Sequence, residues 1–173
     1  NRVPMAELRE CMTELGATDV TTYIQSGNVL FDGAGRSADD WTTRIEAALT
    51  ARFGYDASVV LRSHQELRRV VESAPAGFGA DADRYRSDFV FLKAPMTAAT
   101  ALGQMRTRDG VDTAVAGDGV VYQQRLAARA AQSLFSRFVG TPAYRQSTIR
   151  NWRTTTTLLQ MLDEREIAAA RPG

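Results

Sequence analysis

Residues 22–31 place the strongest constraint on the fold of this chain. They read TYIQSGNVLF, so two short runs of bulky residues flank the polar sequence Ser26-Gly27-Asn28. Aromatic and β-branched residues favour strands, and a glycine between serine and asparagine favours a tight turn. The segment therefore predicts a β-hairpin, which we expect the preceding and following elements to cover.

The length of the chain, 173 residues, allows one large domain or two small ones. Its 44% hydrophobic and 24% charged residues are typical of a soluble globular protein. A net charge of +1 gives no general reason to expect nucleic acid or acidic partners. No apolar run is long enough for a membrane span and no secretory leader is visible, so no membrane partner is expected.

Cys11 is the only cysteine, which excludes an internal disulfide and a cysteine zinc site. This fits a reducing cytoplasm. Because Cys11 lies beside an apolar helix stripe, we expect it to be a small buried core thiol. The chain begins at Asn1 without a methionine, and we expect a segment to precede it.

The first half of the chain predicts three helices and one further strand. Apolar residues at helical spacing indicate helices over 5–15 and 37–54, and the capping-box sequence at 63–66 opens a third helix. The β-branched run at 57–62 predicts a strand between the second and third helices.

The second half begins after loop-forming residues at 75–83, where we expect a domain boundary. Alternating and helical patterns then predict, in order, a strand at 88–93, a helix after Thr97, a hairpin over 111–124, a helix over 130–139 and a final helix from Ser147 to Leu162.

This order of elements predicts an α+β fold of two tandem ferredoxin-like (α-β plait) units. Helix, hairpin, helix, strand is most of a split β-α-β motif, and the first unit lacks only a leading strand before Asn1. We place the first unit at 1–76 and the second, with the C-terminal helix, at 84–173. Helices are expected on one face of each sheet. A single larger sheet is the alternative.

Three motifs together resemble one family. Residues 3–5 (VPM), the hairpin 22–31, and 149–152 (IRNW) followed by Thr154 resemble the bacterial domain of unknown function 1697. The resemblance covers essentially the whole chain. It implies two ferredoxin-like units, in agreement with the pattern of elements, and it implies no activity.

The chain departs from this family at three places. Members usually begin with a strand and a glycine-containing loop, which are absent before Asn1. Arg153 stands where an asparagine is common, and Thr157 stands where a lysine is common. Any role of that lysine in the family is therefore not carried over to this chain.

The first candidate binding site is the turn formed by Ser26, Gly27 and Asn28. Exposed side chains of Ser26 and Asn28, with free backbone N–H groups at a sheet end, would suit an anion or a small molecule. In the structural alternative, Gly27 supplies a positive φ and the flanking side chains bond their own backbone. A serine nucleophile is not expected, because no base is adjacent.

The second candidate site is the start of the final helix. Arg150 and Arg153 would make bidentate contacts to phosphate or carboxylate. Asn151 is near the helix N-terminus, where free amides and the helix dipole favour an anion. In the alternative, Arg150 and Asn151 tie this helix to the second unit through hydrogen bonds.

Residues 119–162 contain six arginines and no acidic residue, although the whole chain carries only +1. Three explanations remain open: a solvated surface that pairs with the acidic first half, a small-anion site, and a nucleic-acid surface with interleaved Tyr122, Tyr144 and Trp152. No RNP-type aromatic sequence accompanies the arginines.

Other functional motifs are not found. The sequence has no phosphate-binding glycine loop, dinucleotide fingerprint or paired histidines, so no cofactor and no metal site is predicted. Asp81 and Asp83 offer too few oxygen ligands for calcium. His64, the only histidine, is expected to be an exposed residue in the first turn of its helix. No catalytic residue is assigned, and whether the protein is an enzyme stays open.

The sequence thus favours a cytoplasmic protein that binds a small anionic ligand, bearing phosphate or carboxylate, between its two units. Ser26, Asn28, Arg150 and Asn151 would line that site. The alternative is a nucleic-acid-associated module that uses the arginine-rich segment 119–162.

Overall fold

The computed structural model describes residues 3–172, and the chain divides into two compact units. The first is Asn1–Leu61 and the second is Arg62–Gly173. Within the described residues, each unit has one antiparallel sheet, of two strands in the first and four in the second, together with several helices. The α+β class predicted from the sequence is confirmed.

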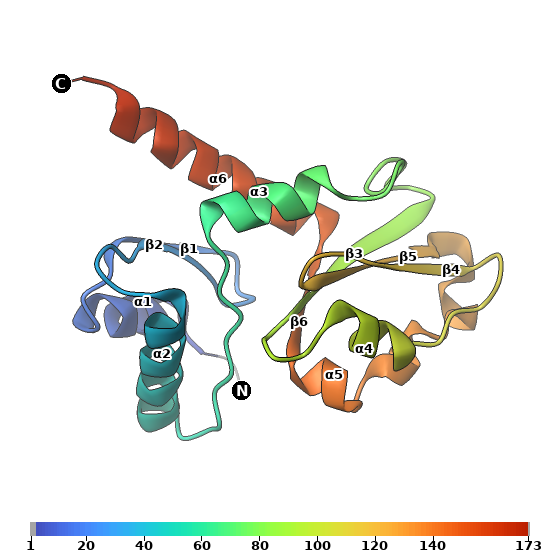
Figure 1. Cartoon of the computed structure of the whole chain (residues 1–173), viewed down its shortest axis with the longest axis horizontal. Helices are drawn as coiled ribbons and strands as arrows, with labels where there is room; N and C mark the ends of the chain where they lie inside the picture. Colours follow the sequence, from blue (N-terminus) through green and yellow to red (C-terminus); the bar gives the residue numbers. More distant parts are fainter. Residues whose placement is uncertain (1–2, 173) are drawn as a thin grey trace. The chain divides into compact units, whose positions relative to one another are not determined.

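The first unit carries the hairpin between two helices in the chain (Figure 1). α1 (Met5–Glu14) is followed by β1 (Thr18–Tyr23), β2 (Asn28–Asp32) and α2 (Ala38–Phe53). β1 and β2 pair antiparallel, as the pattern of residues 22–31 predicts. The unit's core is made mainly by α1 and α2, with buried Leu8, Cys11, Met12, Trp41, Ile45 and Leu49.

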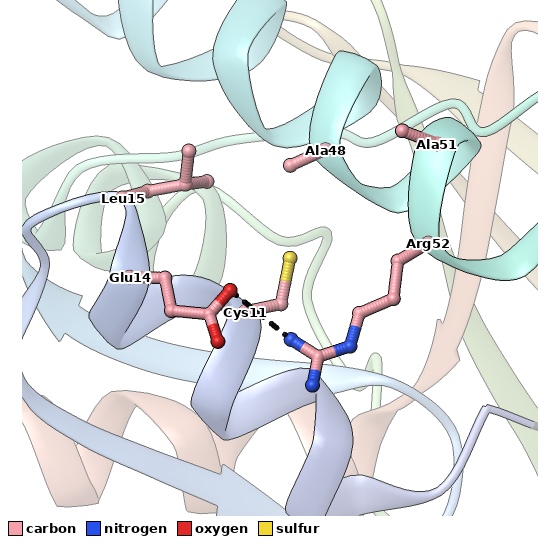
Figure 2. Close-up of a pocket in the computed structure, with 6 residues that line it drawn as sticks. All are labelled: Cys11, Glu14, Leu15, Ala48, Ala51 and Arg52. Carbon is pink, nitrogen blue, oxygen red and sulfur yellow. Dashed lines mark hydrogen bonds and ion pairs between the residues drawn. The ribbon is translucent and has the colours of Figure 1, made fainter.

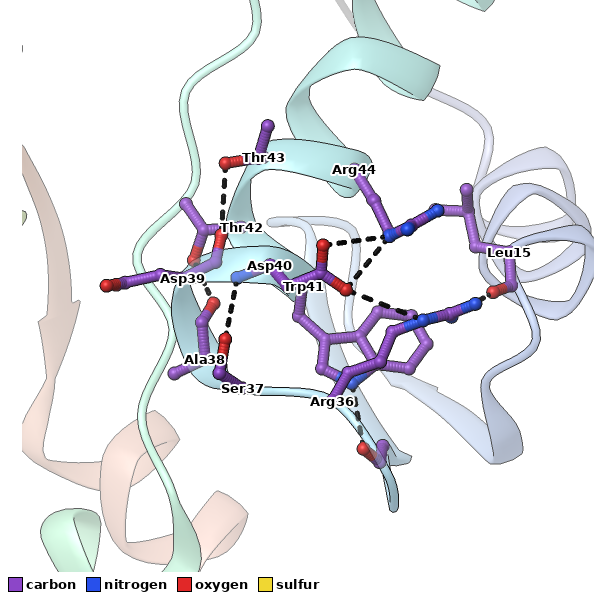
Figure 3. Close-up of polar contacts among 11 residues, drawn as sticks. Leu15, Arg36, Ser37, Ala38, Asp39, Asp40, Trp41, Thr42, Thr43 and Arg44 are labelled. Atoms are coloured by element: carbon purple, nitrogen blue, oxygen red, sulfur yellow. Dashed lines mark hydrogen bonds and ion pairs between the residues drawn. The ribbon is translucent and has the colours of Figure 1, made fainter.

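α2 begins with a side-chain cap (Figure 3). Ser37 Oγ accepts a hydrogen bond from the backbone N–H of Asp40 at 3.1 Å, which satisfies one of the donors left open at a helix start.

In the same turn, Trp41 Nε1 donates to the carbonyl of Gly33 at 2.8 Å. A Cβ on Gly33 would lie 2.4 Å from that nitrogen, so glycine is needed for this approach. Asp40 also pairs with two arginines, Arg36 and Arg44.

Residues 57–62 have no regular structure, so the strand predicted there is wrong. The backbone N–H of Ala57 donates to Thr50 Oγ1, and the N–H of Val59 donates to Glu46 Oε1. Both acceptors are side chains of α2. Because these N–H groups are satisfied by side chains, the segment follows α2 and does not join a sheet.

The second unit is built on a four-stranded sheet (Figure 1). Its strands are β3 (Tyr85–Leu92), β4 (Asp112–Ala116), β5 (Val120–Leu126) and β6 (Ser147–Asn151). Their order across the sheet is β4-β5-β3-β6, and every neighbouring pair is antiparallel. The strand predicted at 88–93 and the hairpin predicted at 111–124 are confirmed.

The two faces of this sheet are covered by different helices. On one face, Val90 and Val121 pack with α4 (Ala98–Gly103) and α5 (Pro142–Arg145). On the other face, Tyr122 Oη donates to the carbonyl of Val70, in α3 (His64–Glu72). The expectation of helices on a single sheet face is therefore wrong for this unit.

The second face is a cluster of aromatic rings. Phe89 stacks on Phe91 and on Trp152, which opens α6 (Trp152–Ala170). Phe78 meets Phe89, Tyr122 and Trp152 edge-on. Such pairs of rings contribute roughly 0.5–1.5 kcal/mol beyond the area they bury. We call Phe78, Phe89, Phe91, Tyr122 and Trp152 the aromatic cluster.

The division between the units precedes α3, whereas the sequence places a boundary at 75–83. α3 packs against α6, and its Arg68 donates to Asp163 and Glu166 on α6 at 3.0 and 2.9 Å. Phe78, in the loop that follows α3, packs against Phe89 in the aromatic cluster. Both segments therefore belong to the second unit, although turn-forming residues separate them from β3.

The predicted helix at 130–139 is replaced by two 3₁₀ helices, η1 (Ala127–Gln132) and η2 (Phe135–Phe138). Between them, the Ser133 hydroxyl and the Leu134 N–H both donate to the carboxylate of Asp112. Because the Leu134 N–H is drawn to a side chain, it does not continue a helical hydrogen-bond ladder.

The final helix begins later than predicted. Residues Ser147–Asn151 form β6, and α6 starts at Trp152 with Asn151 as its N-cap. Thr148 and Ile149 lie opposite Phe91 and Val90 of β3, so pairing with a neighbouring strand overrides the helical pattern. Among residues 3–172, none of the helices is both long and apolar enough to cross a lipid bilayer.

Candidate functional site

Side-chain hydrogen bonds within the hairpin hold the turn at Ser26, Gly27 and Asn28 in place. Asn28 is only 7% exposed, and its Nδ2 donates to the carbonyl of Tyr23 at 3.1 Å and to Ser26 Oγ at 2.8 Å. Gly27 takes a φ of +77°, a conformation that glycine adopts without strain. Ser26 and Gly27 are exposed. The expectation that Asn28 offers an exposed amide is therefore wrong, because that amide holds the hairpin turn.

Arg150 lies on β6 and not on the final helix. Its register partner is Phe89, so its side chain leaves the sheet on the face of the aromatic cluster. The guanidinium Nη1 donates to Thr148 Oγ1 and to the carbonyl of Ile149, both at 2.8 Å. The side chain is half-buried, and this burial lowers the pKa of Arg150 from its ordinary value. A desolvated cation of this kind gains from a neighbouring anion.

Asn151 and Arg153 have different local roles. Asn151 Oδ1 accepts from the backbone N–H of Thr154 at 2.8 Å, which caps α6. Arg153 is exposed in the first turn of the same helix. The structure therefore gives Asn151 a structural task and brings Arg150 and Arg153 to the two sides of the β6–α6 junction.

Arg62 is a half-buried cation that the sequence analysis does not single out. Its Nη2 donates to the carbonyls of Leu92 and Gly119 at 2.6 and 3.0 Å, and its guanidinium carbon lies 6.0 Å from the ring centre of Phe91. Burial is the main cause that lowers the pKa of Arg62, while Glu66 and Asp118 act in the opposite direction. No local pattern marks this residue, because its partners come from distant strands.

The arginine-rich segment 119–162 does not form one continuous surface. Arg125 donates to Asp88 at 2.8 Å on the face opposite Phe89, whereas Arg150 is on the same face as Phe89. The aromatic rings of the sheet, Phe89, Phe91 and Tyr122, are buried. RNA-binding sheets of this general type stack bases on exposed rings, which are not offered by these strands.

A cluster of possible metal ligands joins α3 and α6. Ligand atoms of His64, Asp163 and Glu166 lie within 4.8 Å of one another. Arg68 already donates to both carboxylates, and His64 Nε2 lies 2.6 Å from Asp163 Oδ1. The hydrogen bonds from His64 and Arg68 lower the pKa of Asp163. The cluster thus works as an ion-pair network between two helices, and His64 is half-buried in it rather than exposed.

A shallow pocket of about 370 Å³ lies between α1 and α2 in the first unit (Figure 2). Cys11 lies in this pocket, and Arg52 in its wall pairs with Glu14 at 3.3 Å and with Glu10 at 3.0 Å. Burial raises the pKa of the Cys11 thiol, and the opposing effect of Arg52 is smaller. Since Arg52 already has two carboxylate partners and the thiol is protonated at neutral pH, this pocket is a poor site for an anion.

The described residues thus form two α+β units that carry an ordered hairpin turn and a half-buried arginine. The family model described as protein of unknown function (DUF1697) matches residues 1–122, and the chain belongs to this family. The recognition made from residues 3–5, 22–31 and 149–152 is confirmed, although the last motif lies beyond the matched residues.

The fold is similar to that of a solved structure over most of both chains. This is the structure of conserved bacterial protein SP0830 from Streptococcus pneumoniae, with a TM-score of 0.77 and 25% sequence identity. The alignment covers 93% of this chain and 89% of that chain. No curated protein matches the sequence.

Proposed function

We propose that this protein binds a small anionic ligand, bearing phosphate or carboxylate, and that Arg150 makes the main contact. The observation that carries the proposal is the half-buried guanidinium of Arg150 on the edge strand β6. It lies beside the hydroxyl of Thr148 and next to the start of a long helix.

The electrostatics of Arg150 support an anionic partner. Burial lowers the pKa of this side chain, which means that its positive charge has lost part of its hydration. A carboxylate or phosphate would replace that hydration with charge-assisted hydrogen bonds. Each such bond contributes roughly 1.5–3 kcal/mol.

Arg153 and the N-terminus of α6 add favourable charge. α6 is 19 residues long, and the dipole of a helix places partial positive charge at its first turn. Arg153 is exposed in that turn. Asn151 contributes indirectly, because its cap fixes the end of the helix next to Arg150. The turn at Ser26, Gly27 and Asn28 stays a separate candidate site in the first unit.

The proposal includes a finer description of the fold and of the cellular location. The order β4-β5-β3-β6, with α4 between β3 and β4, supports a ferredoxin-like arrangement of the second unit. For the first unit, we propose an incomplete version of the same arrangement. The single free cysteine supports a cytoplasmic location, where thiols stay reduced.

A thermal-shift titration tests this function. The protein is heated with phosphate, sulfate, acetate and citrate, and the same series is repeated with Arg150→Gln. A ligand at about 100 times its Kd stabilises the native state by about 2.7 kcal/mol, which raises Tm. We expect at least one anion to raise Tm in the unmodified protein and to lose this effect in Arg150→Gln.

The matched control is Arg137→Gln, which removes an equal charge from an exposed position in η2 of the same unit. It should keep the full anion effect. If the two variants lose the effect equally, the anion binds through net charge alone and Arg150 is not the contact. A short oligonucleotide added to the same series tests the nucleic-acid alternative, for which the buried rings of the sheet give no support.

A further inference from the structure

One nitrogen atom of Arg68 lies between three side chains of types that bind metal ions. His64 and Arg68 belong to α3, and Asp163 and Glu166 are three positions apart on α6. We propose that His64, Asp163 and Glu166 form a binding site for a divalent transition-metal ion such as Zn²⁺, which takes the place of the Arg68 guanidinium. This site is separate from the proposed anion site at β6.

The distances around Arg68 describe a coordination centre. Its Nη2 lies 3.2 Å from His64 Nε2, 3.0 Å from Asp163 Oδ1 and 2.9 Å from Glu166 Oε2. The ligand atoms of the three side chains lie within 4.8 Å of one another, and His64 Nε2 is 2.6 Å from Asp163 Oδ1. Around a tetrahedral zinc ion, ligand atoms at about 2.0–2.2 Å from the metal are roughly 3.3–3.6 Å apart. Small rotations of the three side chains therefore bring their ligand atoms onto one ion.

The hydrogen bonds of His64 favour a metal ion over the arginine. Arg68 only donates, so its contact needs a lone pair on His64 Nε2. The pKa of Asp163 is lowered by its hydrogen bonds with His64 and Arg68, so its carboxylate is ionised at neutral pH and needs a hydrogen on that same nitrogen. One nitrogen does not carry both. A metal ion removes the conflict, because it takes the Nε2 lone pair and both carboxylates as ligands.

The charges of the cluster leave it favourable for a cation. Metal binding requires a neutral imidazole, and the two carboxylates then face the single positive charge of Arg68. These four side chains together carry one negative charge. The Arg68 side chain is 37% exposed, and an ion pair at that exposure contributes little to stability. Arg68 can therefore turn towards water when a doubly charged ion takes its place.

The ligand types select the class of metal. Imidazole together with carboxylate suits Zn²⁺ and its first-row neighbours, whereas Mg²⁺ and Ca²⁺ prefer oxygen ligands alone. Three protein ligands leave at least one position of the ion to water. Asp163 and Glu166 are partly exposed, so the ion would reach the site from solvent.

Titration of the full chain, without a histidine tag, with Zn²⁺ tests the site. His64 is the only histidine, so nuclear magnetic resonance observes the proposed ligand directly through one set of imidazole signals. We expect Zn²⁺ to shift these signals, and calorimetry should show one ion per chain. Mg²⁺ should bind at least about tenfold more weakly than Zn²⁺. Imidazole signals that stay unchanged at about 1 mM Zn²⁺ would overturn the proposal.

Variants separate metal binding from the ion-pair network. Arg68→Gln removes the competing guanidinium and should tighten Zn²⁺ binding at least about threefold, a gain that a purely structural network does not predict. His64→Gln and Asp163→Asn each remove a ligand and should weaken binding at least about tenfold. Glu164→Gln is the matched control, because it removes an equal charge from an exposed position of α6 outside the cluster. It should bind Zn²⁺ like the unmodified protein.

The results of these titrations decide the proposal. If Zn²⁺ binds folded His64→Gln as tightly as the unmodified protein, the ion binds elsewhere and the proposal is wrong. If Arg68→Gln binds Zn²⁺ more weakly, the arginine does not compete with the metal and the proposed exchange is wrong. Circular dichroism checks that each variant is folded. Should His64→Gln fail to fold, the imidazole signals of the unmodified protein decide.

Discussion

Tyr122 and Val70 are joined by a hydrogen bond between the central sheet of the second unit and α3. Tyr122 Oη, on β5, donates to the Val70 carbonyl at 2.6 Å, and Tyr122 is buried. Burial raises the pKa of this phenol. A buried phenol without an acceptor would be costly, so this bond helps to hold α3 over the aromatic cluster, together with the contacts of α3 with α6.

Tyr122→Phe tests the strength of that link. Removing the hydroxyl leaves the ring in place and the Val70 carbonyl without its donor, so we expect a loss of about 1–1.5 kcal/mol in the free energy of unfolding. Urea denaturation measures it. Tyr85→Phe, on the neighbouring strand β3, is the control and should change stability less. An unchanged unfolding midpoint in Tyr122→Phe would mean that water replaces the lost donor at no cost.

Gly79 is essential to the packing of Trp152. A Cβ at Gly79 would lie 2.1 Å from the indole ring, and its φ of +81° disfavours any other residue. Gly79→Ala should therefore lower the free energy of unfolding by about 1–3 kcal/mol or more, and reduce the near-ultraviolet circular dichroism of the ring cluster.

Gly103→Ala is the matched control for Gly79→Ala. Gly103 is in the same unit, at the end of α4, with open space around its Cα. Alanine there should leave stability unchanged or raise it by up to about 1 kcal/mol. Equal losses in the two variants would refute the steric explanation.

Asn28 should matter to the hairpin more than Ser26. Asn28→Ala removes the donor that bonds both the Tyr23 carbonyl and Ser26 Oγ, and we expect a loss of about 1–3 kcal/mol in the free energy of unfolding. Ser26→Ala, at an exposed position, should cost clearly less. A larger loss for Ser26→Ala would reverse this assignment. Denaturation followed by circular dichroism measures both variants.

The carboxylate of Asp112 holds the segment after β5, so the stability of the protein should depend on the ionisation of Asp112 in acid. It is 5% exposed and accepts hydrogen bonds from the Ser133 hydroxyl and from the N–H groups of Leu134 and Arg108. Although burial alone would raise the pKa of Asp112, these hydrogen bonds outweigh it, so the pKa is below its usual value of 3.8.

The sign of the pH dependence follows from that lowered pKa. The unfolded carboxyl binds its proton more readily, so the stabilisation is fully present above the usual value of 3.8 and is lost as pH falls through the lower folded value. Asp112→Asn should cost about 1–3 kcal/mol near neutral pH, and the difference from the unmodified protein should shrink as pH falls below 3.8. The exposed Asp109→Asn is the control. A constant difference across the pH range would contradict the role of the charge.

The sequence correctly predicts those structural elements whose signals are local. The capping box at Ser63 and Glu66 forms as the pattern indicates, and Ser37 caps α2. The structural setting of the candidate site residues differs from the expectation: Arg150 is on a strand and not on the final helix, and Asn28 and Asn151 have structural tasks. Arg62 was missed, because its partners Leu92 and Gly119 are distant in the chain.

By itself, the sequence determined the hairpin at 22–31, the α+β class and the family, because turn residues, strand-forming residues and helix caps act over a few neighbouring positions. The tertiary structure alone decided the rest. Residues 147–151 form a strand because their backbone groups pair with those of β3. Residues 57–62 do not form a strand because side chains of α2 accept hydrogen bonds from the N–H groups of Ala57 and Val59. Arg62 bonds the carbonyls of Leu92 and Gly119, and strand register places Arg150 opposite Phe89; such non-local contacts leave no local pattern in a sequence.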